Sequence, residues 1–248
     1  SAAEAERSPV ILQVWYKDLE HISARYFGSA AKLAAEETSV PFALQLDHGQ
    51  NIEQIRECIR WGFSSVMIDL SSLNYQENVA QTKKIVEEAH SQGISVEAEL
   101  GKIFSGHAIV EKQTSSMTDV DQAMHFVDET GVDALAVSVG TAHGVYEYGP
   151  FIDFERLQHI IEKVKVPIVI HGGSFIPEQD VKKMIRLGVA KINIGTELMI
   201  TFLQGLREML FENNKDVPLT RVMSHAGACL EKKVREKINL LTAFRTDK

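Results

Sequence analysis

The chain has 248 residues, of which 44% are hydrophobic and 24% charged, and this suits one sizeable α/β domain rather than two small ones. A formal net charge of −8 gives no indication of a basic surface, so neither nucleic acid nor an anionic membrane is expected as a partner. Two cysteines, Cys58 and Cys229, lie in helix-like stretches, which argues against a disulfide framework and predicts a reducing, cytoplasmic location. No apolar run approaches the roughly 18 residues needed to span a bilayer.

Strand-like and helix-like segments alternate along the chain. The predicted strands are short apolar runs: Val10–Val14, Phe42–Asp47, Ser64–Asp69, Ser95–Leu100, Ala134–Val139, Pro167–His171 and Lys191–Gly195. The segments between them have helical apolar spacing: Asp18–Glu37, Asn51–Trp61, Gln76–Ser91, Thr118–Glu129, Asp153–Val164, Pro177–Leu187 and Thr196–Glu212. Thr118, three residues before Asp121, is the expected cap of its helix. The alternation predicts an α/β fold of the (β/α)8, or TIM, barrel type.

The two ends of the chain complete this prediction. Seven strands can be counted, whereas a closed barrel of this type has eight. Residues Ala2–Arg7 resemble the last turns of a helix leading into the first visible strand, so we expect one further strand before residue 1. Residues Val217–Lys248 are predicted to form a helical extension of a single domain that spans residues 1–248.

Three histidines each follow an apolar run and are themselves followed by glycine. His48, His143 and His171 should lie at the C-terminal ends of parallel strands, where barrels of this type carry their chemistry. One histidine in such a place is commonly a structural residue. Three with the same placement suit a divalent metal, because neutral imidazole is the commonest protein ligand for zinc.

Carboxylates occur at the same strand ends: Asp47, Asp69, Glu97 and Glu99. Glu97 and Glu99 are two residues apart in one strand and should therefore point to the same face of the sheet. Near the top of a barrel, that face can meet a metal or a substrate. The alternative is that these carboxylates bind loop amides or pair with Lys102 and Lys191.

Two glycine-containing segments are typical of phosphate sites. His171-Gly-Gly-Ser174 follows one predicted strand, and Asn193-Ile-Gly-Thr196 follows the next, where a helix begins. Backbone amides at a helix N-terminus bind anions, and barrels often place a phosphate after strands seven and eight. Each segment alone could be an ordinary turn, but the pair at this place predicts an anion site.

These motifs together resemble the class II, metal-dependent fructose-bisphosphate and tagatose-bisphosphate aldolases, from about Ser8 almost to the C-terminus. The matching stretches are Leu46-Asp-His-Gly49, Met67-Ile-Asp-Leu-Ser71, Glu77-Asn-Val79, Val96-Glu-Ala-Glu-Leu-Gly101, Gly140-Thr-Ala-His-Gly144, His171-Gly-Gly-Ser174 and Lys191-Ile-Asn-Ile-Gly-Thr-Glu197. Seven motifs in the same order are a specific match.

The resemblance implies a role for each matching residue. His48, His143 and His171 would bind Zn²⁺ or another divalent metal, and Glu99 would approach an alternative position of that metal. Asp47 would move the proton of the substrate's C4 hydroxyl. Dihydroxyacetone phosphate, with a Na⁺ or K⁺ ion nearby, would be bound by Gly144, Gly172, Gly173, Ser174, Asn193, Gly195 and Thr196.

The implied chemistry is aldol cleavage without a Schiff-base lysine, because a Lewis acid polarises the ketone while a carboxylate moves the proton. The expected substrate is fructose 1,6-bisphosphate, then tagatose 1,6-bisphosphate, with dihydroxyacetone phosphate and glyceraldehyde 3-phosphate as products. We expect a homodimer or homotetramer.

Three features depart from the family pattern. An N-terminal substrate loop containing Asn is absent from this sequence. In the segment after Gly101, His107 occupies the position of the expected glutamate base, and Glu111 is the nearest downstream carboxylate. Phe175 replaces the small residue that usually follows His-Gly-Gly-Ser. His107 is the first candidate for the base at C3 of the ketone phosphate. The alternative function is a catalytically weakened paralogue that serves as a metal- or phosphate-binding partner subunit.

Overall fold

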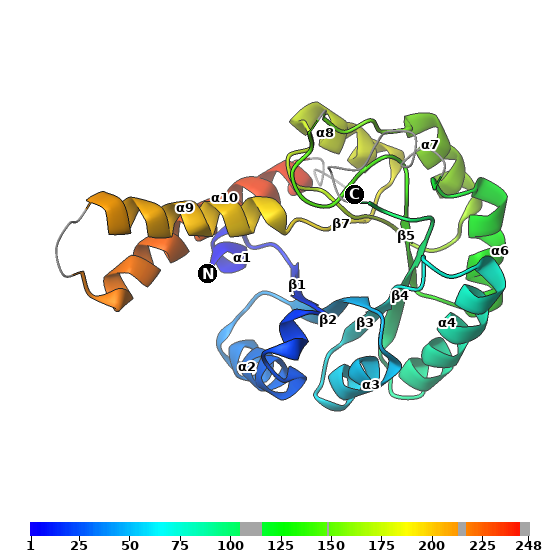
Figure 1. The fold of residues 1–248 in the computed structure, drawn as a ribbon, viewed down its shortest axis with the longest axis horizontal. Helices are drawn as coiled ribbons and strands as arrows, with labels where there is room; N and C mark the ends of the chain where they lie inside the picture. Colours follow the sequence, from blue (N-terminus) through cyan, green and yellow to red (C-terminus); the bar gives the residue numbers. More distant parts are fainter. Residues whose placement is uncertain (105–115, 148, 213–216, 244–248) are drawn as a thin grey trace.

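The computed structural model describes residues 1–104, 116–147, 149–212 and 217–243. Seven parallel strands form one sheet in the order β1 to β7, which is also their order along the chain (Figure 1). The strands are β1 (Val10–Trp15), β2 (Phe42–Gly49), β3 (Ser65–Ile68), β4 (Ser95–Leu100), β5 (Ala134–Val137), β6 (Ile168–Ile170) and β7 (Lys191–Ile192). Within the described residues β7 does not pair with β1, so the eighth strand of a closed barrel is not among them.

Helix α1 (Ala2–Glu6) precedes β1, and the other helices follow strands. Those on the outer side of the curved sheet (Figure 1) are α2 (Ala24–Glu37), which comes after the 3-10 helix η1 (Asp18–Glu20), α3 (Ile52–Arg60), α4 (Tyr75–His90), α6 (Val120–Thr130), α7 (Phe154–Lys163) and α8 (Glu178–Leu187). The last two, α9 (Thr196–Glu212) and α10 (Leu219–Thr242), pack along one another and extend away from the sheet. The described helices include none long and apolar enough to cross a membrane.

Successive side chains of a strand point to opposite faces of the sheet, and here the two faces differ in composition. Side chains such as Leu46, Val66 and Ile170 point outward into one large apolar core shared with the helices. The inner face carries a small apolar group of Met67, Ala136 and Val169. Strand register places Glu97 opposite Met67, and Lys191 opposite Val169, so charged residues share the inner face with this group.

Helix starts follow the sequence with one correction. Asn51, Asn74 and Asp153 accept hydrogen bonds from backbone amides in the first turns of α3, α4 and α7. The predicted cap Thr118 is wrong, because Asp119 caps α6 instead. The Thr118 hydroxyl is buried, where it donates to the Leu100 carbonyl and accepts from the Ser138 amide. It therefore joins the ends of two strands rather than starting a helix.

Candidate metal centre and substrate site

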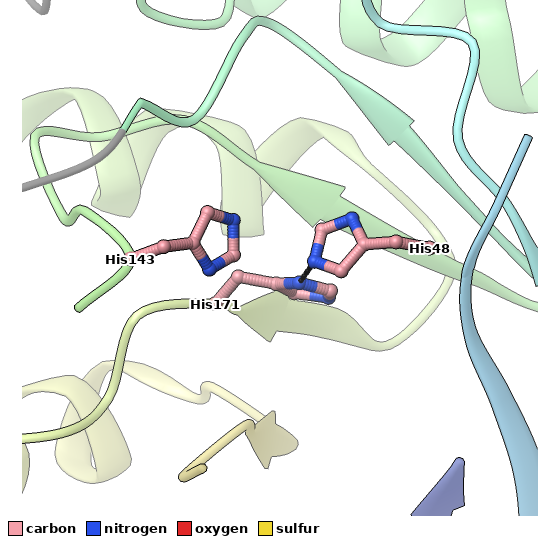
Figure 2. Close-up of side chains that lie close together, drawn as sticks. All are labelled: His48, His143 and His171. Carbon is pink, nitrogen blue, oxygen red and sulfur yellow. Dashed lines mark hydrogen bonds between the residues drawn. The ribbon is translucent and has the colours of Figure 1, made fainter. Parts of the chain in front are cut away.

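The three predicted histidines come together at one end of the sheet (Figure 2). The ring centroid of His48 lies 4.6 Å from that of His171 and 4.8 Å from that of His143, and the remaining pair is 5.9 Å apart. One nitrogen from each ring lies within 4.8 Å of those of the other two. Nitrogen atoms this close can share one metal ion.

Local backbone geometry directs His48 into this group. The pairing of β2 with β3 shifts register between Leu46 and Gly49, and His48 has a φ of 53°. A bulge of this kind bends the strand and re-aims a side chain. Gly49 is required next to it, because an added Cβ would lie 2.5 Å from the Met67 carbonyl oxygen. His171 directly follows β6, whereas His143 lies further on, in the connection after β5.

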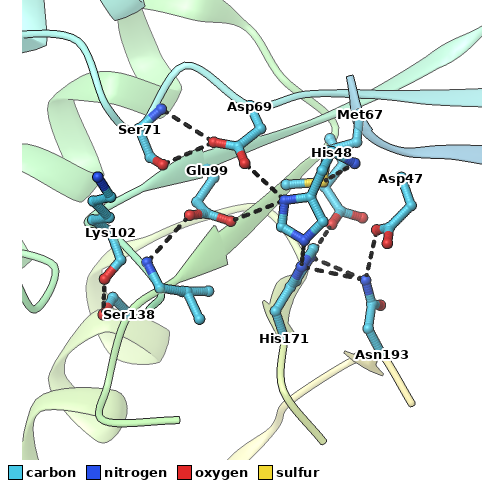
Figure 3. A network of polar contacts seen from close by, with 12 residues as sticks. Asp47, His48, Met67, Asp69, Ser71, Glu99, Lys102, Ser138, His171 and Asn193 are labelled. Atoms are coloured by element: carbon cyan, nitrogen blue, oxygen red, sulfur yellow. Dashed lines mark hydrogen bonds and ion pairs between the residues drawn. The ribbon is translucent and has the colours of Figure 1, made fainter. Parts of the chain in front are cut away.

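Two of the imidazoles contact a carboxylate through one ring nitrogen. Asp69 Oδ2 lies 2.7 Å from His48 Nδ1 (Figure 3). Glu97 Oε1 lies 2.9 Å from His171 Nε2. The other nitrogens, His48 Nε2 and His171 Nδ1, are 2.9 Å apart. In protein metal sites, a ligating imidazole ordinarily contacts a carboxylate or carbonyl through its second nitrogen. The donor set and its support therefore fit a divalent ion such as Zn²⁺.

The pKa values of two of the histidines in this group are shifted in opposite directions. Burial opposes a charge on His48, but the hydrogen bond to Asp69 and the negative charges of Asp47 and Glu99 raise its pKa to about 9. For His143, burial and then the neighbouring imidazoles lower the pKa to about 3. Burial also opposes the charge on Asp69, yet its contact with His48 lowers the pKa of this carboxyl to about 2. An anionic carboxylate behind the imidazoles favours a cation in front of them.

Glu97 is a fully buried carboxylate with three partners. It accepts from Lys191 Nζ at 2.9 Å and from Gln45 Nε2 at 3.0 Å, in addition to its contact with His171. Burial opposes its charge, but Lys191 and His171 lower its pKa to about 2. The alternative predicted for a strand-end carboxylate, pairing with Lys191, is thus present together with the contact to a histidine.

Glu99 lies on the other side of His48. Its Oε2 atom is 3.8 Å from His48 Nδ1, so Glu99 forms a group with Asp69 at the nitrogen that faces away from His171. Burial and the charge of Asp69 raise the pKa of Glu99 to about 8. This buried oxygen has no hydrogen bond within the described part of the chain. A role for Glu99 in metal binding stays a prediction.

Asp47 is held by two side-chain amides. Its Oδ1 atom accepts from Gln13 Nε2 and from Asn193 Nδ2, each at 3.1 Å. Asn193 Nδ2 also lies 3.1 Å from His171 Nε2, and Lys191 donates to its Oδ1 at 2.6 Å. Figure 3 shows Asp47 and Asn193 beside the histidine pair. The predicted acid–base residue is therefore next to the candidate metal centre.

The two predicted phosphate segments adjoin one another. The Gly173 amide donates to the Asn193 carbonyl at 2.9 Å, and Ser174 Oγ accepts from the Glu197 amide in the first turn of α9 at 3.1 Å. The Phe175 amide donates to the Glu197 carboxylate, so this amide and that of Gly173 are already engaged. Two other glycines adjoin open space, because a Cβ added at Gly144 or Gly195 would meet nothing within 4 Å.

Sequence reasoning missed Tyr146. Its hydroxyl accepts from the Ala142 amide and donates to the Gly172 carbonyl, both at 2.9 Å. It therefore links the segment that carries His143 to the predicted phosphate loop. Burial raises the pKa of Tyr146 to about 12, which keeps the phenol protonated as a donor. A lone tyrosine in a loop gives no signal of this role in the sequence.

His107 and Glu111 lie outside the described residues, so the role of His107 as a base stays a prediction.

A curved sheet of parallel strands has helices on its outer side and a cluster of histidines and carboxylates at one end of the strands, and this arrangement defines an α/β protein of the barrel type. The chain matches the family model "Fructose-bisphosphate aldolase class-II" over residues 1–245. It is 36% identical to a sulfofructosephosphate aldolase of Alkalicoccus urumqiensis over 241 residues, which cover 96% of this chain and 84% of the relative. This chain belongs to the class II fructose-bisphosphate aldolase family, whose members are lyases acting on small phosphorylated sugars.

Solved structures agree with this assignment. The crystal structure of the YdjI aldolase from Escherichia coli K12 superposes with a TM-score of 0.85 at 36% identity, covering 97% of this chain and 84% of that one. The fold alone is shared with a fructose-bisphosphate aldolase of Campylobacter jejuni, at 23% identity and a TM-score of 0.82, covering 99% and 86%. The expected TIM-barrel fold and the predicted family are therefore confirmed.

Proposed function

We propose that this chain is a zinc-dependent aldolase that cleaves a ketose phosphate into dihydroxyacetone phosphate and an aldehyde. The observation that carries the proposal is the convergence of His48, His143 and His171, two of them backed by carboxylates. A Zn²⁺ ion bound by these imidazoles would supply a Lewis acid for the ketone oxygen. The chain contributes the remaining steps through its own side chains.

Asp47 is the proposed acid–base group. Its carboxylate takes the proton from the C4 hydroxyl of the ketose as the bond between C3 and C4 breaks, and it returns a proton in the reverse direction. The amides of Gln13 and Asn193 fix the orientation of this carboxylate without adding a positive charge. The proposed base at C3 is His107, because an unperturbed imidazole has a pKa of about 6.5, near working pH.

The phosphate of the ketone half is proposed to bind between two loops and the start of α9. Support comes from the adjacency of the two segments, which the contacts of Gly173 with Asn193 and of Ser174 with Glu197 hold together, and from the open space beside Gly144 and Gly195; the Gly173 amide itself is already bonded. Thr196 begins α9, where the helix dipole favours an anion. A monovalent cation in this region is part of the same proposal.

Three substrates fit the proposal. Fructose 1,6-bisphosphate and tagatose 1,6-bisphosphate differ only in stereochemistry at C4, and the name of one relative at 36% identity adds a sulfonated fructose phosphate. We propose fructose 1,6-bisphosphate as the first substrate to test. The experiment compares cleavage of all three, with and without a chelator. Cleavage of any one that stops with chelator supports the metal-dependent aldolase, and the ranking identifies the substrate.

The second candidate function, a weakened paralogue that binds metal and phosphate, is favoured by His107 in place of glutamate. Exchange of the C3 proton of dihydroxyacetone phosphate with solvent deuterium separates the two functions. Exchange in the parent chain supports the enzyme, and its absence supports the binding protein. Equal exchange rates in the parent and in His107→Ala would remove His107 from the mechanism.

We also propose that the chain forms a homodimer or homotetramer. Large apolar side chains are exposed on α9 and α10: Met199, Leu203, Leu210, Phe211, Leu219 and Met223. Apolar surface of this kind commonly marks a protein–protein contact. Light scattering should give two or four times the mass of one chain, and the mass of a single chain would contradict the proposal.

A further inference from the structure

A second group of metal-binding side chains lies on α9 and α10, outside the three-histidine cluster. Glu208 comes from α9, and His225 and Cys229 come from α10. His225 Nε2 lies 3.0 Å from Glu208 Oε2 and 3.7 Å from Cys229 Sγ, and all three ligand atoms are within 4.8 Å of one another. Cys229 is a free, partly buried thiol.

The three side chains meet because of a sequence spacing within α10 and a close approach of α9 to α10. His225 and Cys229 are four residues apart, so they lie on the same face of α10. Gly205, one turn before Glu208 on α9, allows the helices to approach closely. A Cβ added at Gly205 would lie 2.9 Å from Ala226 Cα and 3.3 Å from Cys229 Sγ. The thiol is thus placed at the contact between the helices, where a carboxylate of the facing helix can meet the same imidazole.

The distances are compatible with a tetrahedral metal site after a small adjustment of one side chain. With bonds of about 2.1 Å to nitrogen or oxygen and about 2.3 Å to sulfur, tetrahedral ligands are separated by about 3.4 Å for nitrogen and oxygen and about 3.6 Å for nitrogen and sulfur. The observed nitrogen–sulfur separation, 3.7 Å, lies close to its value, whereas the nitrogen–oxygen separation, 3.0 Å, is about 0.4 Å shorter and would have to open on metal binding. Without a metal, the same groups contact one another as an ion pair between His225 and Glu208 and a hydrogen bond between His225 and the thiol of Cys229, so a metal would replace both contacts.

We propose that Glu208, His225 and Cys229 form a second metal site that binds a thiophilic divalent ion, Zn²⁺ above all, and joins α9 to α10. Thiolate and imidazole ligands favour zinc and disfavour Mg²⁺ and Ca²⁺, which take oxygen ligands. Binding breaks the S–H bond of Cys229, forms a metal–sulfur bond and releases the proton to solvent. Water completes the coordination, because the side chains of His225 and Glu208 are 39% and 57% exposed.

Cobalt(II) tests this site directly, because a thiolate ligand gives a sulfur-to-cobalt charge-transfer band in the near ultraviolet and three imidazoles cannot. The full chain, stripped of metal with a chelator and checked for folding by circular dichroism, is titrated with Co²⁺. We expect the intensity of the band at saturation to correspond to one Co²⁺ ion per chain at this site, whatever amount the three-histidine centre binds in addition. Cys229→Ser should abolish the band, and His225→Ala should weaken Co²⁺ binding at least tenfold.

Two matched controls complete the experiment. Cys58→Ser should keep the band, because Cys58 is a residue of α3 that is fully buried in the apolar core and belongs to no metal-binding group in the described residues. His143→Ala should also keep it, so failure of the three-histidine site is distinguished from failure of this one. No band in the parent, or an equal band in Cys229→Ser, would overturn the proposal. Hydrogen exchange gives a second readout, since Zn²⁺ should slow exchange along α9 and α10 in the parent but not in Cys229→Ser.

Discussion

Asp47 interacts with neutral donors, and this makes its proposed role testable at the level of one residue. Replacing it by alanine removes the proton carrier but none of the three imidazoles. Asp47→Ala should therefore lower kcat by at least ~10²-fold, the usual contribution of a general acid–base group. Metal content, measured on the same sample, should stay at the parent value. Parent-like turnover would show that another group moves the C4 hydroxyl proton.

Glu97 gives a second prediction at this scale, because it supports His171 from behind. Glu97→Gln keeps the shape but removes the charge that Lys191 and His171 contact. Loss of such a supporting group typically lowers metal affinity by about 10–100-fold, and competition with a chromophoric chelator measures this directly. Glu88→Gln is the control, since Glu88 pairs with Arg56 near the surface and should leave affinity unchanged. Unchanged affinity in Glu97→Gln would mean that His171 needs no such support.

Individual residues were only partly predictable from the sequence. His48, His143 and His171 could be found because each follows an apolar run, and the structure brings them together. Asp69 and Glu97 stood out as strand-end carboxylates, but their pairing with particular histidines depends on the register between neighbouring strands. Register is a tertiary property that a run of residues does not encode by itself.

At the scale of elements, two glycines of the predicted phosphate region differ in whether the structure has room for a side chain. Gly172 has a φ of 70°, and an added Cβ would lie 2.3 Å from the Ala142 carbonyl oxygen. Gly195 has open space at the same atom. Gly172→Ala should therefore lower the melting temperature, since a strained backbone position alone costs about 1–3 kcal/mol.

Gly195→Ala should instead leave the melting temperature near that of the parent. If phosphate binds in this space, the methyl group should raise KM for the ketose phosphate about tenfold, equivalent to about 1.4 kcal/mol of binding. Thermal melts and initial-rate kinetics on both variants provide the comparison. A parent-like KM in Gly195→Ala would place the phosphate elsewhere.

Element boundaries were predictable where local chemistry determines them and not where tertiary contacts do. The Asn51 and Asp153 caps come from side chains that bond their own helix. Thr118 resembled a cap in sequence but donates to Leu100 across the sheet, and Asp119 took its place. The predicted strand Lys191–Gly195 shortens to Lys191–Ile192. The Asn193 amide still donates to Ile170, the last residue of β6, but its carbonyl accepts from Gly173, which lies beyond that strand.

At the scale of the whole molecule, alternating strands and helices were enough to predict a parallel barrel-type sheet, because right-handed crossovers leave few other arrangements. Helix α9 was predicted with its bounds, Thr196–Glu212, but α10 was predicted only as part of a helical extension over Val217–Lys248, and the hairpin that the two form was not predicted. Its direction away from the sheet depends on the contact between the two helices, such as Gly205 against Ala226. Such contacts join residues about 20 positions apart and leave no periodic signal.

Metal removal tests how far the whole fold depends on the three-histidine centre. The core of the sheet is apolar, so stripping the metal should leave far-ultraviolet circular dichroism unchanged at 25 °C. Zinc at 100 times its dissociation constant adds about 2.7 kcal/mol of stability. For a chain of this size that raises the melting temperature by about 5–10 °C. The measurement belongs in a Cys229→Ser background, so that only the histidine centre contributes, with His143→Ala added as the control that should lose the shift. Equal melting temperatures with and without zinc, or full cleavage in excess chelator, would rule out a stabilising catalytic metal at these histidines.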